Sequence, residues 1–498
     1  MGYAKVDQND LMVLLSGRPF IDIRASFNSL VPSGLRHDIG NKIVNAWLSL
    51  LEEQPKLHDK VEFEVIQSAM TFDFDLVFES RFKGVLSKLE LDEFRDSLTV
   101  LTNNLVDISE KSSLKNAISE VLELKDIQVD DYLFSTQTDD IALGTKIQKL
   151  LFDCRSKGTL QFSIIARHAF IAEDLLRSLI RVSAITDERM SEFRQTIHSI
   201  AQDITTDAEQ LTKNLISKKD FMDKYGHLRP GSFDITSLTY RDRPDLFDNI
   251  SGREIAKRKS TFELLEVEEK KINEMLKNIG IRKVDANSLF EYAKIAIEWR
   301  EQAKFIFTKS LSAILENIRI WGRLNGLTDN DLAFLNIEVF TRSGFDSHFK
   351  DAVSKFKKNL NSKRKGHRDL TSLKVNFLCK SQKDLEFVPL QRSEANYITK
   401  QVVKAPIVHL STQNKSEESI DGKIVCIESA DPGFDWIFSH GITGLITRFG
   451  GANSHMAIRC SELNIPAAIG CGEELYQRMQ TSKVIEINCS KNIILIIA

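Results

Sequence analysis

A histidine placed just behind two glycines gives the chain its clearest chemical signal. Gly450 and Gly451 follow a short apolar run, and glycine lets a backbone turn sharply and approach a bulky anion. Asn453 and Ser454 are types that cap helix N-termini, and apolar residues at helical spacing follow them. His455 is therefore expected in the first turn of a helix, where free N–H groups and the dipole favour a phosphoryl group. A histidine there can attack a phosphoryl donor and hold the group on nitrogen.

This stretch resembles the swivelling phosphohistidine domain of the phosphoenolpyruvate-utilising enzymes. That family includes phosphoenolpyruvate synthase, pyruvate phosphate dikinase and rifampin phosphotransferase. The likeness joins residues 447–451, the Ser454-His455 pair and the Ile465-Pro466 step in one order. It implies that His455 carries the phosphoryl group. The alternative is a capped core helix that contains a buried histidine.

Neighbouring residues are expected to serve the same phosphoryl group. Hydroxyl and backbone N–H donors would stabilise its oxygens, and the guanidinium fork matches a phosphate better than a lysine does. Thr447 is expected to orient the imidazole. The expected catalytic residues are His455, Ser454, Thr447 and Arg459, and the expected phosphate-binding residues are Gly450, Gly451, Asn453 and Arg448.

A second informative segment, residues 225–234, carries two glycines and a proline inside an otherwise helical region. Its polar residues His227, Arg229 and Asp234 are of the kind that bind a substrate or a phosphate. The alternative is an ordered turn in which Arg229 and Asp234 pair structurally. The segment resembles a Tyr-Gly-His-Arg-Pro-Gly stretch in the central helical domain of rifampin phosphotransferase-like enzymes. That resemblance implies a substrate or docking role, so an acceptor site is expected near Arg229.

Residues 18–28 and 60–64 alternate apolar and charged side chains, which predicts half-buried strands over Pro19–Ala25 and Val61–Val65. They are similar to the segment that follows the ATP-binding domain in a subgroup of this family that includes glutamine kinase. The resemblance implies that Arg24 and Glu62 or Glu64 bind an amino-acid-like substrate. A charged outer strand face is the alternative.

The expected fold class is multidomain α+β, with a large mainly α-helical central domain and a C-terminal α/β swivelling domain. Apolar residues recur at i, i+3 and i+4 over 150–180, 192–216, 254–279 and 292–324, which predicts helices. The expected divisions are a mixed α/β segment over 1–75, a helical substrate domain over 76–380, a linker over 381–402 and the swivelling domain over 403–498.

Composition excludes little. The 498 residues include 67 basic and 70 acidic ones, a net charge of −3, which gives no reason to expect a nucleic-acid or membrane partner. Six scattered cysteines without a C-x-x-C pair favour a reducing cytoplasm, and no metal site is expected.

The family loads its histidine from ATP and Mg²⁺ through an ATP-grasp domain, and the chain has no glycine-rich phosphate loop and no room for such a domain. The resemblance therefore implies an ATP-grasp domain in trans or a missing one, with no cofactor bound by this chain alone. The absence of a barrel after the histidine domain argues against a phosphoenolpyruvate reaction. A small-molecule acceptor is expected, with an amide such as L-glutamine first. The alternatives are a non-catalytic phosphocarrier or scaffold, and a rifampin-type antibiotic phosphotransferase.

Overall fold

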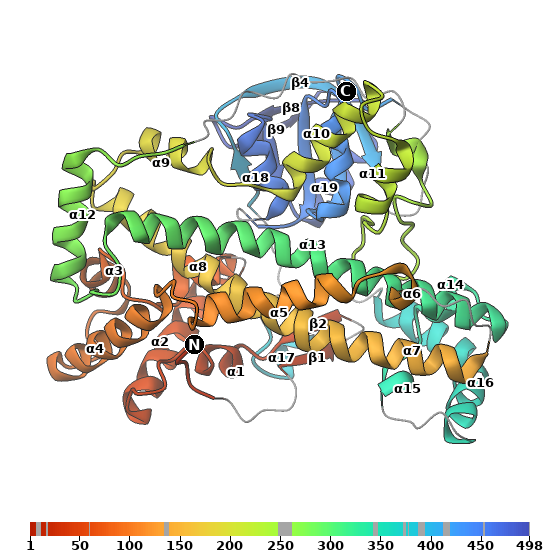
Figure 1. The fold of residues 1–498 in the computed structure, drawn as a ribbon, viewed down its shortest axis with the longest axis horizontal. Helices are drawn as coiled ribbons and strands as arrows, with labels where there is room; N and C mark the ends of the chain where they lie inside the picture. Colours follow the sequence, from red (N-terminus) through yellow and green to blue (C-terminus); the bar gives the residue numbers. More distant parts are fainter. Residues whose placement is uncertain are drawn as a thin grey trace.

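The computed structural model describes residues 1–5, 11–15, 18–58, 60–133, 139–247, 261–341, 347–371, 375–376, 378–386, 394–411, 419–451 and 454–497. One long helix, α13 (Ala286–Leu324), runs across the middle of the molecule (Figure 1). The C-terminal sheet domain lies on one side of it, and most of the helical region lies on the other.

Helix α13 is 39 residues long and begins at the cap Asp285, whose carboxylate accepts the Ser288 N–H at 2.8 Å. Three helices and a short connecting turn pack along it: α5 (Ser113–Ile127), α7 (Asp140–Asp153), η3 (Cys154–Thr159) and α8 (Leu160–Arg181). Small residues such as Ala293, Ala296 and Ala303 are buried in α13, which lets neighbouring helices approach closely. The α13 side chains that face the sheet domain therefore stand on a firmly packed support.

The remaining helices complete the helical region. They are α1 (Ile23–Asn28), α2 (His37–Glu53), η1 (Pro55–Leu57), η2 (Val61–Val65), α3 (Phe74–Phe82), α4 (Lys88–Leu105), α6 (Asp130–Leu133), α9 (Asp187–Arg194), α10 (Ile200–Thr212), α11 (Lys218–Tyr225), η4 (Pro244–Phe247), α12 (Glu266–Asn278), α14 (Asp329–Leu332), α15 (Glu338–Thr341), α16 (Ser347–Thr371) and α17 (Lys383–Glu386). Two of them, α10 and α11, lie beside the sheet domain (Figure 1). Of the helix expected over 254–279, residues 254–260 lie outside the described residues, residues 261–265 are not helical, and α12 covers the rest from Glu266 to Asn278.

The two strands expected near the N-terminus are only partly present. The antiparallel pair β1 (Met12–Leu15) and β2 (Arg18–Ile21) ends at Asp22, whose carboxylate caps α1 at Ala25. The expected strand over Pro19–Ala25 therefore becomes helical halfway, because an N-capping residue lies inside the alternating pattern. Val61–Val65 is wrong as a strand: it forms the helical turn η2, closed by a bond from the Ile66 N–H to the Val61 carbonyl.

One continuous hydrophobic core runs from Phe27 to Phe356. Residues from the segment 1–75, such as Trp47 and Met70, are buried in the same core as the helices that follow. The structure therefore has no packing boundary at residue 75.

The C-terminal domain is a seven-stranded sheet in the order β3-β7-β6-β5-β4-β8-β9. Its strands are β3 (Asn396–Ile398), β4 (Val402–Leu410), β5 (Ile424–Ser429), β6 (Gly444–Phe449), β7 (Ala467–Ile469), β8 (Val484–Asn488) and β9 (Ile493–Ile496). The four central strands are parallel, and the outer ones pair antiparallel. Helices η5 (Pro432–Ser439), α18 (His455–Glu462) and α19 (Glu473–Met479) complete the domain. Since β3 begins at Asn396, the end of the expected linker belongs to the sheet.

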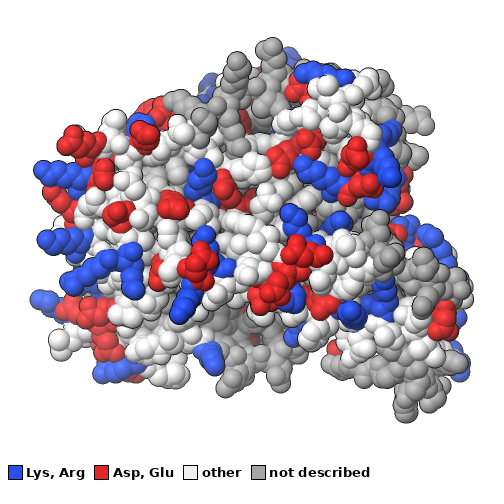
Figure 2. Space-filling view, viewed as in Figure 1, with Lys and Arg blue, Asp and Glu red and all other residues white. Residues whose placement is uncertain are grey.

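The visible face of the described residues carries both signs of charge in alternation (Figure 2). Within the described ranges, no helix combines the length and the apolar character that crossing a membrane requires.

Candidate functional site

His455 is the first residue of α18 and follows the end of β6 by a short turn. Ser454 is the N-cap, and its hydroxyl accepts the Ala457 N–H at 3.4 Å. In the turn, Gly450 has φ of +138°, and a Cβ there would lie 2.7 Å from the Ala430 Cβ. A side chain at this position would be strained and crowded, so the turn requires glycine. Asn453 lies outside the described residues.

Both ring nitrogens of His455 face carboxylates. Its Nε2 lies 2.7 Å from each carboxylate oxygen of Asp435, which is on η5 of the same domain. Its Nδ1 lies 3.1 Å from Oε2 of Glu301, which is on α13 of the helical region. The His455 side chain is 9% exposed, so this first-turn histidine is largely buried in the docked arrangement. The sheet domain is thus docked on the helical region, and His455 lies between these two bodies.

The surroundings of His455 favour its charged form. Burial opposes protonation, but the charge and hydrogen bonds of Asp435, followed by those of Glu301, outweigh it and raise the pKa of His455 to about 9. Burial likewise opposes ionisation of Glu301, whereas its bond to His455 and the charges of Arg300 and Lys304 lower the pKa of Glu301. The docked pair is therefore imidazolium and carboxylate at neutral pH.

Two cations of α13 adjoin this pair. Arg300 Nε lies 4.0 Å from Oε1 of Glu301. Lys304 lies one helical turn further on, and its charge acts on both Glu301 and Asp431 of the sheet domain. Asp431 accepts the Gly433 N–H at 2.8 Å, and burial raises the pKa of Asp431. The described site thus combines a histidine, carboxylates from both bodies and two cations that can neutralise a phosphoryl group.

The other sequence-predicted residues of this domain lie around the turn or at the interface. The Thr447 hydroxyl accepts the Gly470 N–H at 2.9 Å and ties β6 to β7. Arg448 pairs with Glu428 at 2.7 Å and with Glu473 at 3.2 Å. Arg459 is 2% exposed and donates to Glu462 and to the Thr205 hydroxyl of α10 at 3.1 Å. Thr447 and Arg459 therefore bond to groups other than His455 in the docked arrangement.

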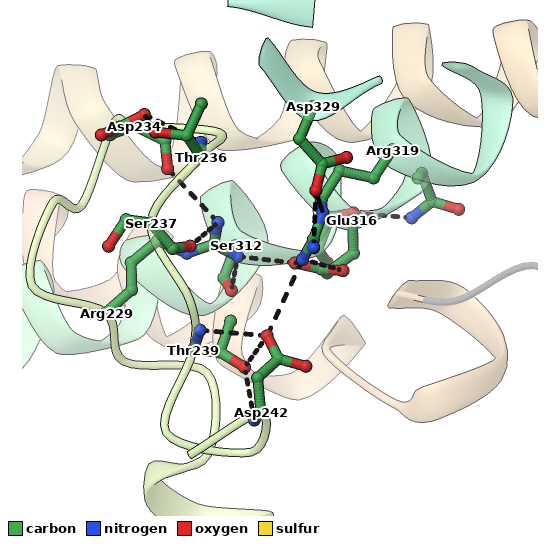
Figure 3. A network of polar contacts seen from close by, with 12 residues as sticks. Arg229, Asp234, Thr236, Ser237, Thr239, Asp242, Ser312, Glu316, Arg319 and Asp329 are labelled. Carbon is green, nitrogen blue, oxygen red and sulfur yellow. Dashed lines mark hydrogen bonds and ion pairs between the residues drawn. The ribbon is translucent and has the colours of Figure 1, made fainter. Parts of the chain in front are cut away.

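Arg229 is buried in a separate ionic network (Figure 3). Its guanidinium donates to Oε1 of Glu316 at 2.9 Å, to the Ser312 hydroxyl at 2.9 Å and to the Ser237 carbonyl at 3.2 Å. Glu316 also accepts two bonds from Arg319, which pairs with Asp329 in turn. Arg229 therefore ties the loop after α11 to α13, and protein groups occupy its two terminal nitrogens.

The other two residues of this loop are placed differently from Arg229. The Asp234 carboxylate accepts the Thr236 N–H and hydroxyl, so it closes a local turn, and only its backbone carbonyl faces Arg229. His227 stacks edge-on against Phe305 at 4.8 Å, and burial lowers the pKa of His227 to about 3. The loop also reaches the sheet domain, because the Tyr240 hydroxyl donates to the Gly433 carbonyl at 2.7 Å.

The N-terminal candidates do not meet these groups. Arg24 donates to the Asn45 side chain at 2.9 Å on an exposed surface. Glu64 pairs with Arg81 at 3.0 Å, and Glu62 lies on the same turn, η2. The structure brings none of the three into contact with His455.

The sequence interpretation missed Asp435, Glu301, Arg300 and Lys304. Asp435 follows an Asp-Pro-Gly turn, which signals a bend but no chemistry. The α13 residues are charged positions of an amphipathic helix, and such positions are ordinarily solvent-facing. They differ from the other charged residues of α13 only because the sheet domain docks against them. Across the described residues, no group of three or more His, Cys, Asp or Glu side chains is placed to hold a metal ion.

A search of curated proteins finds no significant match to the chain. Residues 420–492 match the family described as PEP-utilising enzyme, mobile domain. The matched range contains β5 to β8, the glycine turn, His455 and Asp435. Residues 420–492, which include His455, are therefore similar to the mobile domain of the PEP-utilising enzymes.

Proposed function

We propose that this chain carries a phosphoryl group on His455 and passes it to a small-molecule acceptor held by the helical region. The observation that carries the proposal is the position of His455, in the first turn of α18 behind the glycine turn of a matched mobile domain. Helix N-termini favour phosphoryl groups, and histidine nitrogen is a competent phosphoryl carrier.

The docked arrangement is suited to giving the phosphoryl group away rather than receiving it. A histidine with a pKa of about 9 is protonated at neutral pH, and an imidazolium has no lone pair to attack phosphorus. Loading therefore requires His455 to leave Glu301, which only a movement of the sheet domain away from α13 achieves. Asp435 moves with His455 and keeps its hold on the ring.

Loading forms a phosphorus–nitrogen bond and breaks the bond between phosphorus and the leaving oxygen of the donor. MgATP on an ATP-grasp domain in trans would supply this phosphoryl group. After redocking, Lys304 neutralises the phosphoryl oxygens, and Glu301 accepts the proton of the attacking acceptor. The phosphorus–nitrogen bond then breaks, and its electron pair returns to the imidazole ring. An amide such as L-glutamine is the first acceptor to test.

Phosphoramidate, a small-molecule phosphoryl donor for histidine, tests the carrier step without a partner. We expect acid-labile, base-stable phosphate on a peptide that contains His455, found by mass spectrometry at neutral or basic pH. Labelling should increase from pH 6.5 towards pH 9, because deprotonation frees the ring nitrogen.

The matched control is His58→Ala, which removes an exposed histidine at the end of η1 in the helical region. We expect His58→Ala to take up the His455 label at the wild-type level and His455→Ala to lose it. The same label in His455→Ala, or labelling of other histidines alone, would show that His455 is not the carrier.

A further inference from the structure

A second cluster of cations lies next to the His455 site, where α8 runs antiparallel to α13. Ring contacts between Phe162 and Phe307 and between His168 and Tyr292 fix this alignment. Phe170, two positions beyond His168 on α8, receives guanidinium groups from both helices. Arg167 lies 5.9 Å from the centroid of the Phe170 ring, and Arg300 lies 5.4 Å from it.

Within the part of the chain that the structure describes, neither of these two arginines has an anion of its own. Across the described residues, Arg167 has neither a hydrogen bond nor an ion pair, and its charge acts on the Tyr3 hydroxyl. Among the described carboxylates, Arg300 approaches only Glu301, at 4.0 Å, and Glu301 is already bonded to His455. Half-buried charges are ordinarily paired, and an aromatic face compensates a cation only in part. Two unmatched like charges on one ring indicate a place for a negatively charged group.

The neighbouring Arg177 shows what a satisfied arginine looks like in this cluster. It lies 4.3 Å from the centroid of Phe63, whose ring in turn contacts Phe170. Unlike Arg167, it donates to a carboxylate of its own helix, Glu173, at 2.9 Å. Helix α8 therefore supplies a carboxylate partner for Arg177, whereas it supplies none for Arg167.

A buried amide without a partner among the described residues is linked to Arg167 through Tyr3. Gln67 is 6% exposed, and neither its side-chain oxygen nor its nitrogen has a partner among the described residues. Its neighbour Ser68 accepts the Tyr3 hydroxyl at 2.9 Å, and Tyr3 is the residue on which the Arg167 charge acts. Buried amides are ordinarily hydrogen-bonded. The Gln67 amide can therefore still donate and accept hydrogen bonds that no described residue makes with it.

We propose that Arg167 and Arg300 bind the carboxylate of the phosphoryl acceptor, which places the acceptor beside Glu301 and His455. The inference rests on the proposed function and names its substrate class: a small molecule that bears a carboxylate. The contacts are continuous, because Arg300 meets both the Phe170 ring and Glu301, and Glu301 meets His455. The attacking group of the acceptor gives its proton to Glu301 as the new bond to phosphorus forms and the phosphorus–nitrogen bond breaks.

This acceptor site differs from the site near Arg229 that the sequence predicts. Arg229 already donates to Glu316, Ser312 and a backbone carbonyl, whereas Arg167 donates to none of the described residues. A bound carboxylate requires donors that the protein has not used.

The test measures binding to the unphosphorylated chain by calorimetry. A panel of amino acids and hydroxy acids, with L-glutamine first, is compared with the corresponding α-carboxamides, which lack the carboxylate. We expect at least one acid to bind ten-fold or more tightly than its carboxamide. Arg167→Ala and Arg300→Ala should each abolish that difference, and Arg167→Lys should keep part of it. The matched control Arg177→Ala should preserve it.

If no acid in the panel binds more tightly than its carboxamide, or if Arg167→Ala keeps the full difference, the proposal is overturned. A near-ultraviolet circular dichroism spectrum identifies a variant that fails to fold, and Arg167→Lys then carries the test. Labelling of His455 by phosphoramidate is measured separately. Normal labelling without carboxylate discrimination contradicts only this inference, whereas absent labelling contradicts the proposed function.

Discussion

Helix α13 carries two buried ionic clusters, one around Glu316 and one at Glu301, and they are completed in different ways. Arg229 and Arg319 hold Glu316, and both come from the helical region or its loop. His455 holds Glu301, and it belongs to the sheet domain. A movement of the sheet domain, as proposed above, would leave the first cluster complete and would break the second. A buried charge whose partners are all permanent stabilises the fold, and one whose partner departs can act as a switch.

Arg229→Ala should cause the largest loss of stability. Removing the arginine leaves Glu316 without its most buried partner, and breaking such a pair costs about 3–5 kcal/mol in the free energy of unfolding. Urea unfolding followed by circular dichroism measures the loss. The exposed Arg241→Ala, whose pair with Asp223 is at the surface, serves as control and should cost less than about 1 kcal/mol. If the two variants lost the same free energy of unfolding, the Glu316 cluster would not be a special source of stability.

Gly433→Ala should separate the two bodies while leaving both folded. A Cβ at Gly433 would lie 1.9 Å from the Arg229 carbonyl oxygen, so docking cannot persist unchanged. Overpacking of this kind costs about 1–3 kcal/mol, enough to open the interface. Small-angle scattering should give a larger radius of gyration. Gly366→Ala is the control, because a Cβ there meets no atom within 4 Å. A variant as compact as the wild type would mean that the interface tolerates the methyl group.

Glu301→Gln should weaken the second cluster without disturbing the first. The substitution removes the charge that Glu301 presents to His455, so the pKa of His455 should fall towards its ordinary value of 6.5. A double-mutant cycle with Asp435→Asn should give a coupling of about 0.5–3 kcal/mol, since both residues hold one ring. Nuclear magnetic resonance titration of His455 measures the shift. An unchanged pKa would mean that Glu301 and His455 do not meet in solution.

Alkaline pH should have the smallest effect, on docking alone. Because the pKa of His455 is raised when docked, the stabilisation is complete below about pH 6.5 and is lost as pH rises through about 9. A neutral ring still keeps one hydrogen bond, so the interface should loosen rather than open. Protease cleavage between the two bodies should become faster over that range in the wild type. In Glu301→Gln the dependence should shift to lower pH, and a pH-independent rate in both would contradict the charged pair.

The sequence predicted the local features that depend on neighbouring residues. The glycine turn, the Ser454 cap and the start of α18 at His455 follow from residue types a few positions apart. The helices α8 and α13 follow from their apolar spacing, whereas the helix expected over 192–216 is interrupted between α9 and α10. The alternation in Val61–Val65 misled, because packing on α2 and the rest of the core overrides a five-residue pattern. The partners of His455 were out of reach: Glu301 is 154 positions away, and its meeting with His455 depends on how two bodies dock.

The length of α13 has a mechanical consequence. Glu301 and Glu316 lie fifteen positions apart on one uninterrupted helix, a separation of about 22 Å at 1.5 Å per residue. The sheet domain touches the helix at the first point through His455, and it touches the loop anchored at the second point through Gly433. Two supports so far apart resist tilting, so the domain should return to the same orientation after each excursion. The uninterrupted helix α13 thus keeps the two contact points at a fixed separation, which orients His455 whenever the sheet domain docks.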